Sequence, residues 1–436
     1  MHSLTQLAHA LRTGELELVQ YLAELEITFN QREPHVLAFV PEEGRFDRLR
    51  RAAVRLLRDY PDPATRPALF GVPLGVKDIF HVDGLPTRGG SRVPTDVVQS
   101  WGGGVQAESV TRTRQAGALI LGKTVTTEFA YFGAGPTRNP HNAAHTPGGS
   151  SSGSAAAVGA GICPLTLGTQ TIGSITRPAA YCGAVGYKPS YERISRAGVI
   201  PLSPALDHIG PFANDVAGVA LAASVLVADW QGVPSLNLNP SAVRLGIPSG
   251  NYLQNASSQG LQQFATVVTR LQSAGFVTVH VPVMPDFADI YDRHQRIVAA
   301  DAARVHANWF AHWADHYQPK TQDLIRRGKT ISAEQYAKDC LGREALRSAL
   351  HTAMDEHQLH LWISPSAPDI APHGLESTGN PVMNLPFSQA GLPTLGIPSG
   401  WEQVSGLPFG LQLAARFGQD EQLMALGMQI EAILAS

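Results

Sequence analysis

The sequence predicts an α/β protein in which strands and helices alternate along one chain of 436 residues. Short apolar runs of strand length recur between segments whose apolar residues follow the helical period. No internal repeat and no low-complexity linker divides the chain. We therefore expect a single large domain over residues 1–436.

The first third of the chain contains helices before its first strands. Leu4, Leu7 and Leu11 repeat at helical spacing up to Gly14, and a second apolar set follows, so residues 3–30 predict two amphipathic helices. Residues 46–60 carry a basic amphipathic pattern that predicts another helix, whose charges form a solvated face. The elements expected after it are a buried strand with one lysine (GVPLGVKDIF, 71–80), a helix (105–117) and a strand (118–124).

Residues 133–154 are rich in Gly, Ser and Pro and carry no periodicity, which is typical of an ordered functional loop. SAAAVGAGICPLTLGTQT (154–171) predicts a small-residue helix followed by a strand. Helix formers and aromatic residues predominate over 286–357. The remaining expected helices are 215–228, 258–275 and 420–434, and the remaining strands are 276–283, 359–367 and 393–400.

Composition excludes several classes of protein. The net charge of −3, from 33 basic and 36 acidic residues, gives no reason to expect nucleic acid or an anionic membrane as a partner. No run of about 18 apolar residues occurs, and the N-terminus resembles no targeting peptide. Three cysteines without a CxxC pair suit a reducing compartment. We expect a soluble, cytoplasmic protein.

Two Ser/Gly-rich segments carry the strongest chemical signal. They are TPGGSSSGSAAAVGAG (146–161) and GTQTIGSITRPAAYCG (168–183). Small residues let backbone N–H groups approach a ligand oxygen, and a turn that aligns several N–H groups forms an anion-binding nest. A serine at the end of such a turn can attack a carbonyl whose oxygen lies in the nest.

Together with GVPLGVKDIF, these segments resemble the amidase signature family. Lys77 lies in the strand motif, Ser150 in the GGSSxGS turn and Ser174 in the GTxTxGS segment. LDHIGPFAND (206–215) and a C-terminal stretch beginning at GLPTLGIPSG resemble further family elements, and residues 65–215 hold the signature core. The resemblance implies a central mixed β-sheet covered by helices on both faces.

The resemblance also implies a mechanism. Ser174 is the nucleophile, and Ser150, on a cis peptide bond in this family, passes its proton to neutral Lys77. The oxyanion binds to the backbone N–H groups of Thr171, Ile172, Gly173 and Ser174. The substrate is a small-molecule amide, no metal or cofactor takes part, and a homodimer is usual for the family.

A lysine acts as a base near neutrality only where burial lowers its pKa. Lys77 is flanked by Gly75, Val76, Ile79 and Phe80, which suits burial. Asp78 would oppose the shift, but strand alternation directs it to the other face.

The sequence departs from the common family pattern at four positions. Gln170 replaces a usual Asp, Ile172 a usual Gly, and Ser152 stands where Gly is frequent. Ile172 is the least comfortable change, because a branched side chain disfavours positive φ. Arg177 lies directly before Pro178, as in the malonamidase-like subgroup, where it would hold a substrate carboxylate; a structural salt bridge is the alternative.

Other interpretations of the same residues remain. GSSSG (149–153) fits a nucleophile elbow with Ser151 as nucleophile, although the residues before it are not strand-like. Taken singly, Ser174 is a turn serine and Lys77 a surface lysine. His312 and His316 have the i, i+4 spacing of zinc ligands but are ordinary helix histidines more often. Trp309, Phe310, Trp313 and Tyr317 either line a substrate entrance or pack in a core.

Two functions follow from this interpretation. The first is an amidase that hydrolyses a carboxylated amide, an aryl amide or a carbamate, with residues 286–345 as a helical substrate-pocket segment. The second is an amidotransferase-type subunit that works with a partner protein, whose pattern more often has Asp at position 170 and Arg at position 176.

Overall fold

The computed structural model describes residues 3–235 and 239–435. They form one domain around a ten-stranded sheet of order β2-β1-β3-β5-β4-β9-β10-β8-β6-β7. The strands are β1 Pro73–Lys77, β2 Leu119–Thr124, β3 Leu165–Gln170, β4 Val185–Lys188, β5 His208–Ala213, β6 Arg244–Ser249, β7 Val277–Pro282, β8 Leu361–Pro365, β9 Thr394–Trp401 and β10 Pro408–Ala414. β1 pairs in parallel with β2 and β3, and β6 with β7 and β8, whereas the central pairs are antiparallel. The predicted mixed sheet is confirmed.

Helices precede, cover and extend this sheet. They are α1 Leu4–Thr13, α2 Leu18–Val36, α3 Arg45–Asp59, α4 Thr95–Gln99, α5 Glu108–Gln115, α6 Ser152–Gly159, α7 Thr176–Cys182, α8 Val216–Leu226, α9 Ser258–Ser273, α10 Phe287–Val305, α11 Ala307–Trp313, α12 Pro319–Gly328, α13 Ala333–Glu356, α14 Leu385–Gln389 and α15 Asp420–Ala435. Short 3-10 turns are η1 Pro63–Thr65, η2 Trp101–Gly104, η3 Glu128–Ala130, η4 Pro240–Ala242, η5 Leu253–Asn255 and η6 Ala314–His316. Every helix and strand expected from the sequence is present.

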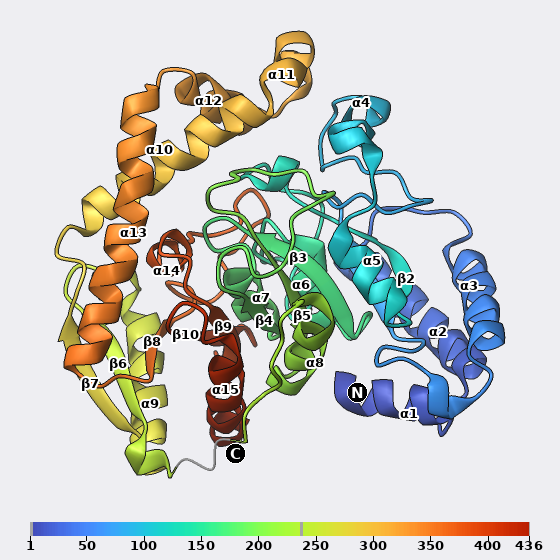
Figure 1. The fold of residues 1–436 in the computed structure, drawn as a ribbon, viewed down its shortest axis with the longest axis horizontal. Helices are drawn as coiled ribbons and strands as arrows, with labels where there is room; N and C mark the ends of the chain where they lie inside the picture. The colour runs from blue at the N-terminus through green and yellow to red at the C-terminus, as the bar shows by residue number, and fades with distance from the viewer. Residues whose placement is uncertain (1–2, 236–238, 436) are drawn as a thin grey trace.

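Helices cover both faces of the sheet, as predicted (Figure 1). Successive residues of a strand point to opposite faces. A Cβ on Gly427 of α15 would lie 2.6 Å from the side chain of Leu395 in β9. A Cβ on the next strand residue, Gly396, would lie 2.9 Å from the backbone of Thr176 in α7. α7 and α15 therefore lie on opposite faces.

Four strands were not expected: β4, β5, β6 and β10. β5 contains Pro211, β6 contains Pro248 and β10 begins at Pro408. Proline cannot donate to a β-ladder and therefore argues against a strand in a sequence. In the ladder between β3 and β5, Pro211 lies opposite Leu167, whereas the β4 ladder reaches only Phe212 and Ala213.

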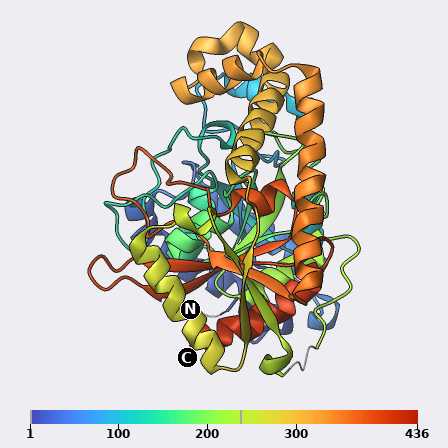
Figure 2. The ribbon, with the colours of Figure 1, turned by 90° about the vertical axis from the view of Figure 1, so that its left-hand side faces the viewer.

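α10, α11, α12 and α13 form an arm beside the sheet, and we call these helices the arm (Figures 1 and 2). The expected helical character of residues 286–345 is confirmed. The arm's aromatic residues surround Phe129, whose ring centroid lies 4.7 Å from that of His306, 5.7 Å from Trp309 and 5.3 Å from Tyr317. This geometry favours packing over a substrate entrance for those rings.

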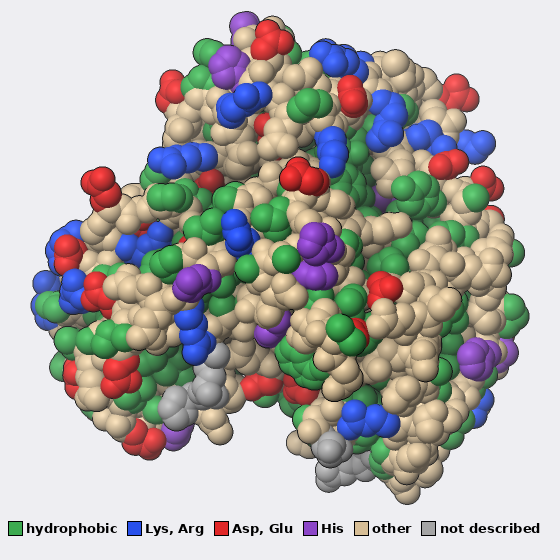
Figure 3. Space-filling model, turned by 180° about the vertical axis from the view of Figure 1, so that it is seen from behind, with side chains coloured by type: hydrophobic (Ala, Val, Ile, Leu, Met, Phe, Trp, Pro, Cys, Tyr) green, Lys and Arg blue, Asp and Glu red, His purple; other side chains and the backbone are tan. Residues whose placement is uncertain are grey.

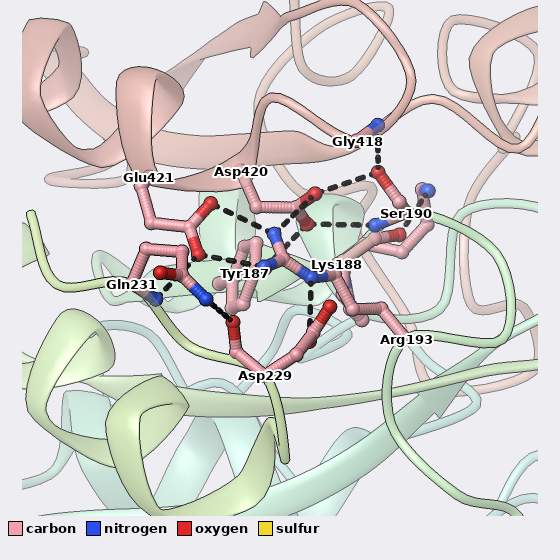
Figure 4. Close-up of polar contacts among 10 residues, drawn as sticks. Tyr187, Lys188, Ser190, Arg193, Asp229, Gln231, Gly418, Asp420 and Glu421 are labelled. Atoms are coloured by element: carbon pink, nitrogen blue, oxygen red, sulfur yellow. Dashed lines mark hydrogen bonds and ion pairs between the residues drawn. The ribbon is translucent and has the colours of Figure 1, made fainter.

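A buried carboxylate fixes the start of α15 to the segment after β4 (Figure 4). Asp420 is fully buried. It accepts hydrogen bonds from Tyr187 Oη at 2.5 Å and from Ser190 N and Oγ at 2.8 and 2.6 Å. Arg193 pairs with Asp420 at 3.0 Å and with Glu421 at 2.6 Å. These contacts join the C-terminal helix to the centre of the sheet.

Acidic and basic side chains are interspersed on the face seen from behind (Figure 3). This distribution suits the small net charge. In the described ranges, no helix has both the length and the apolar character that a membrane crossing requires.

Candidate active site

Lys77 ends β1, between β2 and β3, and is fully buried. Its Nζ lies 2.8 Å from Ser150 Oγ, 3.1 Å from Ser151 Oγ and 2.8 Å from Thr169 Oγ1. No carboxylate among residues 3–235 and 239–435 forms a salt bridge with it. Burial lowers the pKa of Lys77 to about 7, and the charge of Asp207 opposes that shift. An amine with this pKa is half neutral near pH 7.

Asp78 faces away from this amine, as strand alternation predicts. Its carboxylate lies 2.8 Å from the ammonium of Lys123, and both side chains are buried. The charge of Asp78 is thus compensated by Lys123 on the far face and does not pair with Lys77.

Ser150 follows a cis peptide bond from Gly149, as the resemblance implies. A Cβ on Gly149 would lie 2.8 Å from Thr378 Cγ2, so the turn leaves no room for a side chain there. Ser152 Oγ donates to Gly148 O at 2.8 Å. Serine at 152, where glycine is frequent, therefore closes the turn that presents Ser150.

The loop between β3 and α7 presents a row of free donors. The backbone N–H groups of Thr171, Ile172, Gly173 and Ser174 donate no hydrogen bond within the part of the chain that the structure describes. Four consecutive unpaired donors at the end of a strand form the kind of nest that binds an oxyanion.

Gln170 holds this loop in place. Its Oε1 accepts hydrogen bonds from the N–H groups of Ile175 at 2.7 Å and Thr176 at 2.9 Å. Its Nε2 donates to Ser388 Oγ at 2.9 Å, and that hydroxyl donates to Ile172 O at 2.6 Å. A neutral amide thus accepts on one side and donates on the other, which a carboxylate at this position could not do.

Ile172 adopts no positive φ, so the strain expected of a branched side chain here is absent. Its side chain packs into the second hydrophobic core, which includes Tyr252 and Phe387. Gly173 is the residue that must be glycine, because a Cβ there would lie 2.3 Å from Asn384 Oδ1. Asn384 cannot easily retreat, since its Nδ2 donates to Ser366 O and Gln412 Oε1, each at 2.9 Å.

A narrow cavity, with only about 10 Å³ of free volume, brings these groups together. Its polar lining comes from Ser150, Ser174, Thr171, Ile172 and Arg177, and its other walls are Ala130, Tyr131, Phe132, Leu202 and Pro381. Ser174 is 8% exposed, and its hydroxyl makes no hydrogen bond to any described residue. A serine that is accessible and unbonded is free to attack a bound ligand.

Ser151 does not fit the alternative role of nucleophile. It is fully buried and lies outside the cavity lining. Its Oγ donates to Thr169 O at 3.1 Å and accepts from Thr169 N at 3.2 Å. The nucleophile-elbow interpretation of GSSSG is therefore wrong, because this hydroxyl is committed to β3.

Arg177 forms a wall of the cavity and makes no salt bridge with any described residue. Its Nη1 donates to Gly379 O at 2.8 Å and its Nη2 to Gly149 O at 2.5 Å and Thr378 Oγ1 at 3.2 Å. Its Nε is buried without a partner among the described residues. Burial lowers the pKa of Arg177 to about 10, with Tyr181 opposing that shift. The structural salt bridge considered for this residue is thus absent.

The arm lines a second, wider cavity outside the first. This outer cavity has a volume of about 550 Å³ and is bounded by Tyr131, Phe132, Lys320, Asp323, Leu324 and Arg327. Tyr131 and Phe132 belong to both cavities. Of residues 286–345, expected to wall the substrate pocket, only residues of α12 line this outer cavity, whereas the inner wall comes from residues 130–132, Leu202 and Pro381.

Asp207 and Thr169 belong to the same site but were not singled out from the sequence. Thr169 precedes Gln170 in the signature segment, and its hydroxyl is a direct neighbour of Lys77. Asp207 lies in LDHIGPFAND, a segment recognised only as a family element. Neither spacing nor periodicity reveals such contacts, because they join strands that are distant in sequence.

Comparisons with known proteins agree with this geometry. The family model described as Amidase matches residues 43–424. The A subunit of glutamyl-tRNA(Gln) amidotransferase from Roseiflexus sp. (strain RS-1) is 31% identical, with 98% of this chain and 96% of the relative covered. The protein of that description from Chloroflexus aggregans is 32% identical, with 98% and 96% covered. A solved structure described as "Crystal structure of amidase" superposes with a TM-score of 0.87 at 29% identity over 99% of both chains.

These relatives do not single out the malonamidase-like subgroup, so closeness to it stays a prediction. The family model covers every strand of the sheet and all residues of the inner cavity. The chain belongs to the Amidase family.

Proposed function

We propose that this chain hydrolyses the C–N bond of a small amide through an acyl-enzyme on Ser174, with Ser150 and Lys77 as the proton relay. The observation that carries the proposal is the environment of Lys77. A buried amine with no salt-bridge partner in the described chain contacts the Ser150 hydroxyl at 2.8 Å. Ser150 in turn lines the cavity that also contains Ser174.

Proton transfer and bond changes balance along this relay. Ser174 Oγ attacks the amide carbon, and its proton passes through the Ser150 hydroxyl to neutral Lys77. The C–N bond breaks as the departing nitrogen takes a proton back along the same path, which leaves an ester on Ser174. Water then attacks the ester and gives a proton to Lys77 through Ser150. Release of the carboxylic acid returns a proton to Ser174.

The negative charge of each tetrahedral intermediate lies on the former carbonyl oxygen. The free N–H groups of Thr171, Ile172, Gly173 and Ser174 are the donors proposed for it. Donors fixed in advance stabilise developing charge without reorganising during the reaction. Gln170, which binds the loop on both sides, supplies that fixed position.

The relay requires Ser174 Oγ to come within hydrogen-bonding distance of Ser150 Oγ. The structure contains no such hydrogen bond, but both hydroxyls border one cavity and Ser174 has no competing partner among the described residues. A bound substrate that fills the cavity would exclude water from this contact. Ser174→Ala should abolish turnover, and Lys77→Met should do the same, with the thermal unfolding of both variants recorded as the control.

Arg177 supports a carboxylated amide as the substrate. A guanidinium without a carboxylate partner, at the wall of the cavity, favours an anionic ligand group. The cavity is narrow, which favours a small substrate. Monoamides of short dicarboxylic acids and neutral amides of equal length test this choice. Equal kcat/KM for both sets would refute a role for Arg177 in recognition.

The amidotransferase-type function is the second candidate. The relatives of about 31–32% identity support it, because they are described as the A subunit of such an enzyme. Gln170 and Thr176 count against it, since the resemblance more often places Asp and Arg there. Release of ammonia from simple amides by the purified chain alone favours the amidase. Activity that requires a co-purifying partner protein favours the amidotransferase. The expected homodimer and cytoplasmic location remain predictions.

A further inference from the structure

We propose that Asp207 is a positioning residue that ties the loop of residues 171–174, here called the oxyanion loop, to the opposite wall of the cavity, and that its negative charge acts on Lys77. This inference rests on the proposed function. It assigns a role to a residue that takes no part in the relay and does not border the cavity.

The carboxylate of Asp207 bridges two segments of the cavity wall. One oxygen accepts a hydrogen bond from Thr171 Oγ1 at 2.5 Å, at the first residue of the oxyanion loop. The other accepts from the N–H groups of Leu202 at 2.9 Å and Ser203 at 3.0 Å. Thr171 and Leu202 both line the cavity. The distance between these walls is therefore set by one carboxylate.

The same carboxylate connects the site to the arm. Ser203, whose N–H binds Asp207, donates its Oγ to Asp301 Oδ2 at 2.6 Å in α10. Asp301 Oδ1 accepts from Tyr336 Oη at 2.7 Å in α13. A continuous set of hydrogen bonds thus runs from α13 through α10 to Thr171, and Asp207 is its link to the oxyanion loop.

Two basic groups of the described chain interact with Asp207. Its carboxylate acts electrostatically on Lys77 of β1. Arg196, from the segment after β4, favours the charged form of Asp207, and its guanidinium donates to Asp207 O at 3.4 Å. His208 follows in the chain, but burial keeps its pKa well below the usual value, so the ring is neutral. Asp301 lies beyond Ser203. Burial raises the pKa of Asp207 to about 6, and the hydrogen bond from Thr171 opposes the shift.

The test separates the charge of Asp207 from its hydrogen bonds. Asp207→Asn removes the charge and leaves one acceptor. Thr171→Val removes the hydrogen bond between Thr171 and Asp207 but leaves the charge of Asp207. Thr171→Ser keeps a hydroxyl that can form this hydrogen bond. kcat and KM are measured from pH 5 to 9 for each variant of the full chain on one neutral amide, since a neutral substrate adds no ionisation of its own.

Loss of the charge should stabilise neutral Lys77. The acidic limb of kcat/KM in Asp207→Asn should therefore move to lower pH by about 0.5–1 unit. Its plateau kcat should fall about 10-fold or more with KM within about 3-fold, because a displaced oxyanion donor affects the transition state and not the bound substrate. Thr171→Val should show the same fall in kcat, but its acidic limb of kcat/KM should move by less than about 0.3 pH unit. Thr171→Ser should recover most of the lost kcat.

Asp420→Asn is the matched control. Asp420 is also a buried carboxylate with three hydrogen bonds, but it lies at the start of α15 and not at the cavity (Figure 4). It should lower the melting temperature without moving the acidic limb. If the acidic limb of kcat/KM in Asp207→Asn stays in place or moves to higher pH, the charge of Asp207 does not act on Lys77 as proposed. If Thr171→Val has the same kcat as the parent, the hydrogen bond from Thr171 to Asp207 does not position the oxyanion loop. This second result decides the question even where Asp207→Asn does not fold.

Different results would refute the proposed relay and the proposed role of Asp207. Turnover that survives in Lys77→Met or Ser174→Ala removes the relay and the inference with it. Inactive Lys77→Met and Ser174→Ala, together with an Asp207→Asn variant that behaves like the parent, remove the inference alone.

Discussion

The pKa of Lys77 fixes the pH dependence of the proposed reaction. With a pKa of about 7, the neutral fraction of this amine is about 1% at pH 5, about half at pH 7 and about 99% at pH 9. kcat/KM for a neutral amide should therefore rise about 100-fold from pH 5 to 9, with nearly all of the rise below pH 8. A lysine with its ordinary pKa would be only about 0.03% neutral at pH 7, and the rise would continue beyond pH 9.

The assay is ammonia release at constant ionic strength, with kcat/KM taken from initial rates at each pH. Lys188 provides the control, because it is a second fully buried lysine and burial lowers its pKa to about 7 as well. It donates to backbone carbonyls of Pro189 and Leu392 and not to a cavity hydroxyl. Lys188→Met should keep the limb near pH 7, whereas Lys77→Met should be inactive at every pH.

A profile that is flat from pH 5 to 9 would contradict Lys77 as the base. Lys77 would also be contradicted as the base if the change in kcat/KM near pH 7 disappeared in Lys188→Met while turnover persisted. The group that titrates near pH 7 would then be Lys188, acting through the folding of the chain. Melting temperatures recorded at each pH distinguish a loss of activity from a loss of structure.

Four further outcomes are expected. Ser174→Ala should lose all measurable turnover and keep the parent's melting temperature. Gly173→Ala should lower kcat about 100-fold or more, because the new Cβ would lie 2.3 Å from Asn384 Oδ1. Lys77→Met should gain stability relative to the parent at acidic pH, where burying a charged amine is costly. Since the unfolded chain holds the proton up to pH 10.5 and the folded chain only to about 7, parent stability rises with pH, and the gap should shrink by about 4 kcal/mol between pH 6 and 10. EDTA should leave turnover unchanged, because no step uses a metal.

The sequence allowed the α/β class, the single domain and the central residues of the site to be predicted. Lys77, Ser150 and the GTQTIGS segment lie in short motifs that resemble those of a known family, so one sequence is enough to name them as candidates. Asp78 illustrates the same point, because strand alternation alone placed it on the face away from Lys77.

Contacts between residues of different helices, strands and loops could not be predicted from the sequence. The tie between Asp207 and Thr171 joins residues 36 positions apart, and Gln170 contacts Ser388 at a separation of 218. No local period encodes such pairs, because they depend on how strands assemble. Strands with internal proline were missed for a related reason: Pro211 argues against a strand locally, and only its place in the ladder permits it.

The substitution at Gln170 connects these observations. Where the resemblance predicts Asp, this chain places an amide directly after Thr169, whose hydroxyl contacts Lys77 at 2.8 Å. A carboxylate there would point to the opposite face of β3 from Thr169, so it would lie away from Lys77 as Asp78 does. The amide caps the loop through the N–H groups of Ile175 and Thr176. Burial causes most of the shift in the pKa of Lys77, and the charge of Asp207 opposes it. Because Asp207 also accepts a hydrogen bond from Thr171, one carboxylate both moderates the basicity of Lys77 and holds the oxyanion loop.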